Sequence, residues 1–142
     1  MERFEHFTLS VFSITRYWNK IATEEMKPYG LRGAYALYLM MLSEHEMTAS
    51  QLAETTQRDK ADVSRAIAAF QKKGIVEPYG TNRYRVPIRL TDKGRILVKQ
   101  IQKKANDALK SAGQGLSEEM RQNMYTSLDT IADNLKEMYR KE

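Results

Sequence analysis

The chain has 142 residues, of which 42% are hydrophobic, and a formal net charge of +5, which suits one domain, with or without extensions that need a partner to cover them. It contains no cysteine, which excludes disulfides, thiolate metal sites and thiol-based redox sensing. Acidic residues do not surround its two histidines at metal-ligand spacing, so we expect neither a metal nor a cofactor.

Nothing in the sequence suggests export or membrane contact. No run of apolar residues approaches the ~20 that span a bilayer. The opening MERFEHF carries acids and aromatics where a signal peptide has a basic start and an apolar stretch. We therefore expect a soluble protein that stays in the cytoplasm.

The charge is unevenly distributed along the chain. Residues 58–104 carry thirteen Lys and Arg against four Asp and Glu, a net charge of +9, whereas the remaining residues carry −4. A basic centre between acidic ends is typical of a phosphate-binding protein, although a solvated surface alone also produces local imbalance.

Residues 1–29 are predicted to contain one long helix, because apolar side chains recur there at steps of three and four before Pro28 and Gly30 break the chain. Its apolar seam consists of Phe4, Phe7, Val11, Ile14, Trp18 and Ile21. A second helix follows over 33–45, where apolar residues occur on nearly every side. We expect that helix to be central and buried all round.

Two further helices follow in close succession. In 47–57, Thr48 and Gln51 have the spacing of a capping box, which predicts a short third helix. Asp59 is a good N-cap and Gly74 a good left-handed end, so a fourth helix is predicted over about 59–73. The apolar stripe of this fourth helix is formed by Val63, Ala66, Ile67 and Phe70. Its opposite face carries small residues and two cations, namely Ala61, Ser64, Arg65, Ala68 and Lys72.

Over 75–90 the period changes from helix to strand, which predicts a β-hairpin with a turn at 80–82. Four apolar or aromatic residues alternate there with Arg83, Arg85, Pro87 and Arg89. Three arginines are therefore expected on one face of a protruding arm. Pro87 cannot donate to a ladder, which fits a ribbon whose outer side pairs with nothing.

Two more helices complete the chain. Thr91 and Asp92 start a fifth, Gly113 and Gly115 end it, and Ser117 caps a sixth. The sixth helix again has a long apolar seam, formed by Leu116, Met120, Met124, Leu128, Ile131, Leu135 and Met138.

This order of elements predicts a mainly α fold, a winged helix-turn-helix with a two-stranded β wing and dimerisation helices at both ends. The second helix of such a motif enters the major groove of DNA, which is about 12 Å wide, and its outer residues must fit against base edges. Small residues let the backbone approach, while Arg65 suits a guanine. Arg83 at the wing tip suits a narrow minor groove, and Arg85 and Arg89 suit phosphates.

Asp62 leaves two interpretations open, because it either accepts a hydrogen bond from cytosine N4 or repels phosphates and helps to cap the helix. Taken alone, the fourth helix also suits an ordinary surface helix, since alanine is the best helix former. The predicted DNA-contacting residues are Ser50, Lys60, Ala61, Asp62, Ser64, Arg65, Ala68, Lys72, Arg83, Arg85 and Arg89.

The stretch DKADVSRAIAAFQKKGIV, followed by NRYRVPIRLTDKG, resembles the multiple antibiotic resistance regulator (MarR) family. The residues that carry the resemblance are Val63, Ser64, Arg65, Lys73, Gly74, Asn82, Arg83, Leu90 and Thr91. The resemblance implies a homodimeric transcriptional regulator, usually a repressor, with a wing arginine in the minor groove. Four positions depart from the family pattern: Asn82 replaces an aspartate, Asp62 replaces a Ser or Thr, and Arg32 with Gly33 replaces the usual capping pair.

The resemblance also implies a small aromatic effector, bound between the dimerisation helices and the DNA-binding lobe. Candidate residues for that pocket are Arg16, Tyr17, Trp18, Tyr35 and Tyr38, although aromatic residues at helical spacing are more often core. The effector itself cannot be identified from the sequence.

The two end helices are predicted to form a dimer, because helices two to five already cover the centre and the seams need another partner. The alternative is that both end helices fold back on their own domain. The expected division is 1–29 for the first dimerisation helix, 30–95 for the DNA-binding domain and 96–142 for the C-terminal helices. The predicted dimerisation residues are Phe4, Phe7, Val11, Ile14, Leu128, Ile131, Leu135 and Met138.

Two other classes of function compete with DNA binding. A winged helix that binds an acidic protein in place of DNA would have the same basic face. An enzyme is disfavoured, because no Ser/His/Asp set, nucleophilic cysteine, glycine-rich phosphate loop or carboxylate pair in a plausible pocket can be assembled from these residues.

Overall fold

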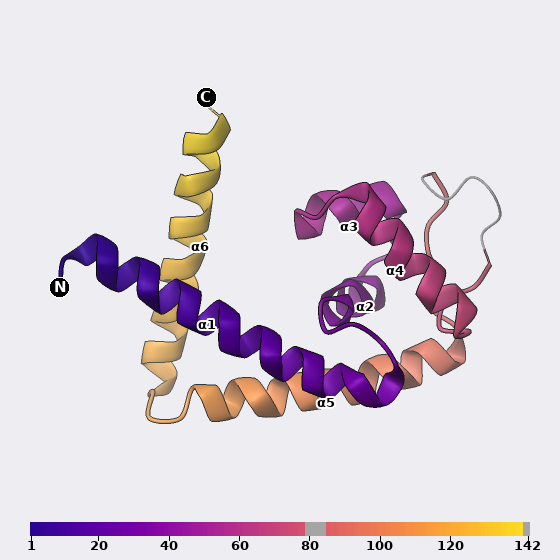
Figure 1. Cartoon of the computed structure of the whole chain (residues 1–142), viewed down its shortest axis with the longest axis horizontal. Helices are drawn as coiled ribbons and strands as arrows, with labels where there is room; N and C mark the ends of the chain where they lie inside the picture. The colour runs from indigo at the N-terminus through magenta and orange to yellow at the C-terminus, as the bar shows by residue number, and fades with distance from the viewer. Residues whose placement is uncertain (79–84, 141–142) are drawn as a thin grey trace. The chain divides into compact units, whose positions relative to one another are not determined.

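The computed structural model describes residues 1–78 and 85–140 (Figure 1). The chain forms two compact units, Met1–Asn106 and Asp107–Glu142. The elements in chain order are α1 (Arg3–Met26), η1 (Lys27–Tyr29), α2 (Tyr35–Glu44), α3 (Ala49–Thr56), α4 (Lys60–Lys72), α5 (Asp92–Ala112) and α6 (Glu118–Arg140). The six helices predicted from the sequence are therefore confirmed, with η1 as an added turn after α1.

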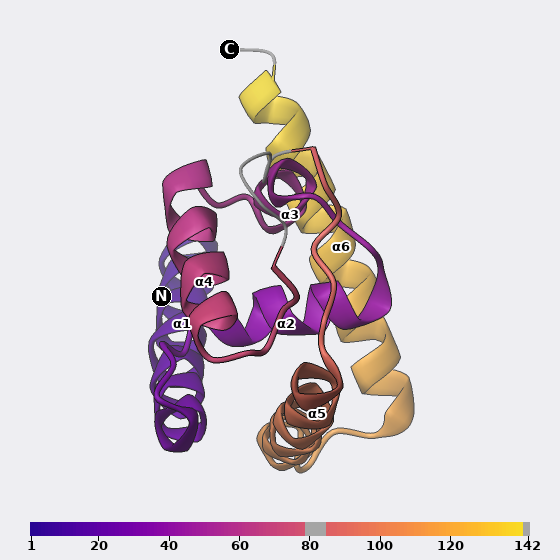
Figure 2. The same ribbon diagram turned by 90° about the vertical axis from the view of Figure 1, so that its right-hand side faces the viewer.

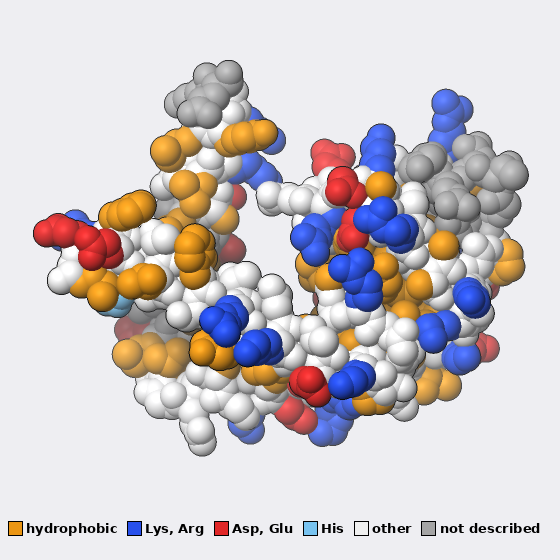
Figure 3. Space-filling view, viewed as in Figure 1, with side chains coloured by type: hydrophobic (Ala, Val, Ile, Leu, Met, Phe, Trp, Pro, Cys, Tyr) orange, Lys and Arg blue, Asp and Glu red, His pale blue; other side chains and the backbone are white. Residues whose placement is uncertain are grey.

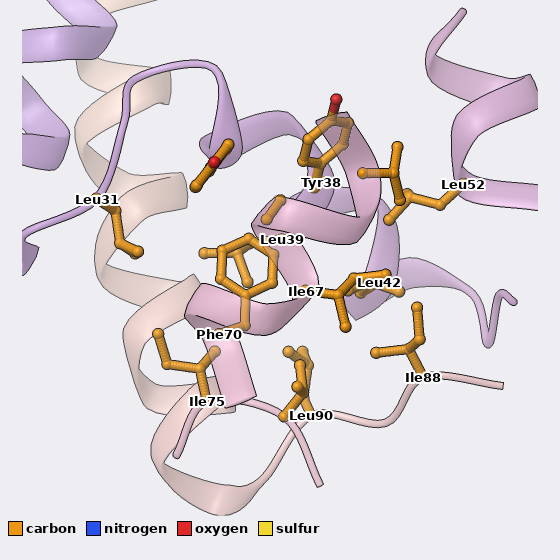
Figure 4. Close-up of a cluster of buried hydrophobic side chains, with 14 of the residues drawn as sticks. Leu31, Tyr38, Leu39, Leu42, Leu52, Ile67, Phe70, Ile75, Ile88 and Leu90 are labelled. Atoms are coloured by element: carbon orange, nitrogen blue, oxygen red, sulfur yellow. The ribbon is translucent and has the colours of Figure 1, made fainter. Parts of the chain in front are cut away.

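The core of the first unit lies where α2, α3 and α4 meet the chain that follows α4. Leu39, Leu52 and Ile67 have no exposed surface, and Phe70 packs edge-on against the ring of Tyr35 at 5.7 Å between centroids. Figure 4 shows residues from all three helices in this cluster, together with Ile75, Ile88 and Leu90 from the segment after α4. The predicted apolar stripe of α4 is fully buried.

The expected all-round burial of α2 is wrong in one respect. Tyr35, Tyr38, Leu39 and Leu42 are buried, but the side chain of Leu37 is half exposed. An apolar pattern predicts that a helix face is buried, but it does not predict whether the residues that bury it belong to the same chain.

Local capping explains where the central helices begin and end. Gln51 N donates to Thr48 Oγ1 at 3.2 Å and Thr48 N donates to Gln51 Oε1 at 2.9 Å, which is the predicted capping box of α3. The carboxylate of Asp59 accepts from the backbone of Asp62 at 2.6 Å and starts α4. Gly74 has a φ of +72°, as a left-handed helix end requires.

The start of α5 packs closely on the segment after α4. Thr91 Oγ1 donates to the carbonyl of Gly74 at 2.6 Å and accepts from Gly94 N at 3.0 Å. A Cβ atom at Gly94 would lie only 2.1 Å from the carbonyl oxygen of Ile75. This position therefore requires glycine for close approach and not for an unusual φ.

The predicted two-stranded wing is not found as a ladder in the described residues. Isolated antiparallel bridges join Val76 to Leu90 and Met47 to Ile88, and Glu77 N donates to Arg89 O at 2.8 Å. The two arms of this segment run side by side near the start of α5 (Figures 1 and 2). Pro87 has no N–H to extend the pairing. The predicted turn at 80–82 lies outside the described residues.

The second unit contains the end of α5, a turn and α6. Met120 N donates to Ser117 Oγ at 3.2 Å, so the predicted cap of α6 is confirmed. Arg121 Nη2 donates to the carbonyl of Gly113 at 2.9 Å across the turn. None of the side chains of α6 is buried. Among the described residues of the whole chain, no helix has the length and apolar character needed to cross a membrane.

Candidate nucleic-acid interface

The outer face of α4 is held rigidly because its opposite face is part of the core. Val63, Ala66, Ile67 and Phe70 are completely buried and fix both the position and the rotation of the helix. As a result the predicted contact residues point outward. Ala61, Arg65, Ala68 and Lys72 are exposed and Ser64 is half buried.

A tight turn connects α3 to α4. Gln57 has a φ of +56°, and Arg58 N donates to the carbonyl of Ala53 at 3.0 Å, which closes the C-terminus of α3. Ser50 is half buried in the first turn of α3, and Lys60 is exposed in the first turn of α4. Two helices joined in this way, with the second presenting an exposed cationic face, have the geometry of a helix-turn-helix. Figure 3 shows Lys and Arg side chains gathered over the α3 and α4 region.

Asp62 makes contacts that the sequence analysis did not anticipate. Its Oδ2 accepts a hydrogen bond from the hydroxyl of Tyr38 at 2.5 Å, and its Oδ1 lies 3.5 Å from Arg65 Nη2 and 3.9 Å from Arg32 Nη1. The side chain of Asp62 is only 17% exposed, whereas both arginine side chains are more than 60% exposed. The carboxylate therefore joins the exposed face of α4 to the buried helix α2.

The electrostatics of this contact favour a charged carboxylate and a neutral phenol. The hydrogen bond from Tyr38 lowers the pKa of Asp62, and the positive charges of Arg58, Arg32 and Arg65 lower it further against the opposing effect of burial. Burial, and then the hydrogen bond to Asp62, raise the pKa of Tyr38 to about 12. Asp62 is consequently ionised, and Tyr38 is a donor, at neutral pH.

The predicted wing arginines are only partly described. Arg85 is exposed, and Arg89 is exposed with its Nε 3.4 Å from Glu46 Oε1. Such an exposed ion pair is weak and leaves the remaining guanidinium nitrogens of Arg89 accessible to another anion. Asn82 and Arg83, predicted at the wing tip, lie outside the described residues.

The five residues proposed for an effector pocket do not gather in the single chain. Tyr35 and Tyr38 are buried in the core with their ring centroids 6.0 Å apart. Arg16, Tyr17 and Trp18 are exposed on α1, where the Arg16 guanidinium lies 5.7 Å from the ring centre of Tyr17. The pocket therefore stays a prediction, and any version of it needs something else to cover α1.

The predicted dimerisation residues are exposed in the single chain. On α1, Phe4 and Ile14 are 77% and 68% exposed, and on α6, Leu128 and Met138 are 51% and 64% exposed. Orange side chains mark both helices in Figure 3. The remaining predicted dimerisation residues, Phe7, Val11, Ile131 and Leu135, are also exposed. Exposed apolar seams of this length are characteristic of interaction surfaces.

Comparison with known proteins places this arrangement in a known fold. Residues 29–82 match the model of the MarR family, and no curated protein matches the chain. A MarR transcriptional regulator from Methanosarcina mazei Go1 is 21% identical and superposes with a TM-score of 0.83 over 94% of this chain and 99% of that one.

Two other similar structures hold ligands. Staphylococcus aureus MarR, in complex with salicylate and kanamycin, is 17% identical with a TM-score of 0.81 over 94% of this chain and 92% of that one. A putative MarR family transcriptional regulator from Listeria monocytogenes, complexed with a 26mer DNA, is 21% identical with a TM-score of 0.80 over 90% of this chain and 87% of that one. At these identities the likeness establishes the fold.

Proposed function

We propose that this chain, whose residues 29–82 match the model of the MarR family, is a transcriptional regulator that binds double-stranded DNA sequence-specifically as a homodimer and acts as a repressor. The observation that carries the proposal is the outer face of α4. Two alanines and Arg65 stand exposed there on a helix whose opposite stripe is completely buried. A rigid helix with such a face fits the major groove.

The contacts divide into those that select bases and those that position the protein. Arg65 donates to a guanine O6/N7 pair, while Ala61 and Ala68 allow the backbone to approach and touch thymine methyl groups. Ser50, Lys60 and Lys72 contact phosphates, as do Arg85 and Arg89 from the wing, and Ser64 lies against base edges. Arg83 occupies the minor groove beside the wing.

The exposed seams of α1 and α6 support the proposed dimerisation. A 23-residue helix with no buried side chain is marginal in water, because helical stability in proteins comes mainly from packing an apolar face. A two-fold partner that buries these seams would set two copies of α4 about one DNA turn, ~34 Å, apart over a pseudo-palindrome. A dimer on such an operator represses by occupying the promoter.

Release by a small aromatic effector is the remaining part of the proposal. A similar structure holds salicylate, and the exposed Tyr17 and Trp18 of α1 offer aromatic surface that the dimer would enclose. Binding of an effector at that place acts on the spacing of the two copies of α4, and a change of spacing weakens binding to an operator with fixed half-sites.

The proposal is tested by selecting duplexes from a random pool and measuring affinity across a salt series for the selected and scrambled sequences. We expect the selected duplex to bind at least 100-fold more tightly and log Kd to rise with log salt by ~0.9 per phosphate neutralised. Equal affinity for both duplexes, with binding to an acidic protein, would instead support a winged-helix interaction module.

A further inference from the structure

The recognition helix α4 carries a negative charge inside an otherwise cationic face. Asp62 lies one turn before Arg65, whose guanidinium is near Asp62 Oδ1. The buried hydroxyl of Tyr38 donates a hydrogen bond to the other carboxylate oxygen of Asp62, Oδ2. Tyr38 is 1% exposed and comes from the central helix α2, so its hydroxyl is a fixed donor. The carboxylate cannot swing away without breaking this bond.

The two carboxylate oxygens have different tasks. Oδ2 is taken by Tyr38, while Oδ1 faces the guanidinium groups of Arg65 and Arg32. Arg32 is also restrained by α2, because its guanidinium lies 5.7 Å from the ring centre of Tyr35. A cytosine N4 would have to compete with two arginines for Oδ1. The arrangement thus disfavours the cytosine N4 role of Asp62 and agrees with its other predicted effect, the repulsion of phosphates.

A carboxylate beside Arg65 changes what this arginine can bind. A guanidinium has five donors, so one contact with Asp62 leaves the rest for a guanine edge. A phosphate is different, because it would bring a full negative charge next to Asp62. The pair therefore lowers affinity for DNA backbone of any sequence more than it lowers affinity for a matching base, which is how specificity arises from a repulsive element.

We propose that Asp62 is a specificity-determining positioning residue: anchored by the Tyr38 hydroxyl, it orients Arg65 toward base edges and opposes contact of this surface with phosphates. The proposal rests on the DNA-binding function proposed above. It assigns a role in DNA recognition to Tyr38, a buried residue that does not itself reach the helix surface.

The first experiment compares variants on the selected duplex and on a scrambled duplex of the same composition. Asp62→Asn keeps the size of the side chain and removes its charge, and we expect it to bind scrambled DNA about three- to tenfold more tightly while losing affinity for the selected duplex. Tyr38→Phe removes the hydroxyl that anchors Asp62 and also interacts with Arg58, and it leaves the charge of Asp62 in place, so we expect it to lose affinity for the selected duplex and leave affinity for scrambled DNA nearly unchanged.

Two matched controls separate this role from net charge and from core packing. Glu54→Gln removes one negative charge from the exposed surface of α3, and Tyr35→Phe removes a hydroxyl from the same helix as Tyr38. Both are expected to keep the wild-type ratio of the two affinities. Thermal unfolding of each variant confirms that it is folded. A change of equal factor on both duplexes in Asp62→Asn and Tyr38→Phe would overturn the proposal.

The second experiment needs no DNA. Nitrogen relaxation of the Arg65 Nε–Hε group reports how ordered the guanidinium is, and we expect its order parameter to fall in Asp62→Asn and in Tyr38→Phe but not in Tyr35→Phe. Unchanged order in the first two variants would overturn the positioning role. If the wild type binds both duplexes equally, the DNA-binding function fails and the specificity role with it. If only the variants fail to differ, the DNA-binding function stands without this role for Asp62.

Discussion

The lobe formed by α2, α3 and α4 and the helix α1 have similar apolar patterns in sequence but opposite burial. The stripe of α4 has no exposed surface, whereas the seam of α1 is largely exposed, with Ile14 at 68%. The lobe is therefore complete within one chain, while α1 carries an apolar face that one chain does not cover. In the proposed function, the lobe contacts DNA and α1 mediates association between two chains.

The largest expected effect is the loss of the proposed dimer. Ile14→Glu places a charge in the centre of the exposed seam, and burying it would cost several kcal/mol. We expect the dimer Kd to rise about 1,000-fold, ~4 kcal/mol, as measured by light scattering over a concentration series. Ser13→Glu, at an exposed position of α1 outside the apolar seam, is the control and should stay dimeric. A wild type that is monomeric at micromolar concentration would contradict the proposed dimer.

The next largest effect is a loss of stability in the folded lobe. Gly94→Ala places a methyl group 2.1 Å from the carbonyl oxygen of Ile75, so either α5 or the segment after α4 must shift. We expect the free energy of unfolding to fall by about 3 kcal/mol in urea denaturation. The control is Gly113→Ala, whose methyl group would meet only the movable guanidinium of Arg121 at 3.1 to 3.3 Å. Comparable losses in both variants would show that close packing at Gly94 is not the cause.

A pH series tests the link between Tyr38 and Asp62. The pKa of Tyr38 is raised from 10.0 to about 12, so its neutral form stabilises the fold fully below pH 10, and this contribution is lost as pH rises toward 12. A shift of this size corresponds to ~2 to 3 kcal/mol. Tyr38→Phe should therefore lose less stability than the wild type between pH 9 and about 11 in urea unfolding, whereas Tyr35→Phe should follow the wild type.

At acid pH the contribution of Asp62 to stability changes in the opposite direction, because it is lost as pH falls. The pKa of Asp62 is lowered from 3.8, so its charged form stabilises the fold above that value, and the contribution is lost as pH falls through the lower pKa of the folded state. Asp62→Asn should flatten this acid loss and reduce, without abolishing, the alkaline limb, because burial raises the pKa of Tyr38 more than Asp62 does. If Asp62→Asn and the wild type lose stability in parallel below pH 4, the carboxylate is not held as the structure describes.

Local chemistry explains which parts of the fold the sequence could predict. The caps at Thr48, Asp59 and Ser117 accept hydrogen bonds from backbone groups three residues further on, so they can be predicted from a short stretch of sequence. The buried stripe of α4 follows equally from helical periodicity. These local rules placed the helices and the exposed face of α4 correctly.

Contacts between distant residues were not predictable in this way. Tyr38 and Asp62 are 24 positions apart, and only the spacing of Asp62 and Arg65 gave a local signal of an ion pair. The bridge from Met47 to Ile88 depends on the fold bringing the two together, and Pro87 limits its extension. The half-exposed Leu37 likewise could not be separated from core by pattern alone.

The smallest expected effect is a loss of DNA affinity that leaves the proposed dimer unchanged. Arg65→Ala removes the proposed base contact from the exposed face of α4 without touching the core or α1. We expect a loss of ~1 to 3 kcal/mol on the selected duplex and less on scrambled DNA, measured by fluorescence anisotropy at fixed salt. Arg85→Ala, which removes a proposed phosphate contact from the wing, should weaken binding to both duplexes alike and reduce the salt slope by about one. Because neither change lies in the seam of α1, light scattering should find both variants as dimeric as the wild type. If Arg65→Ala lowers the affinity for every duplex sequence by the same factor, Arg65 contacts only the DNA backbone, and other residues of α4 must select the bases.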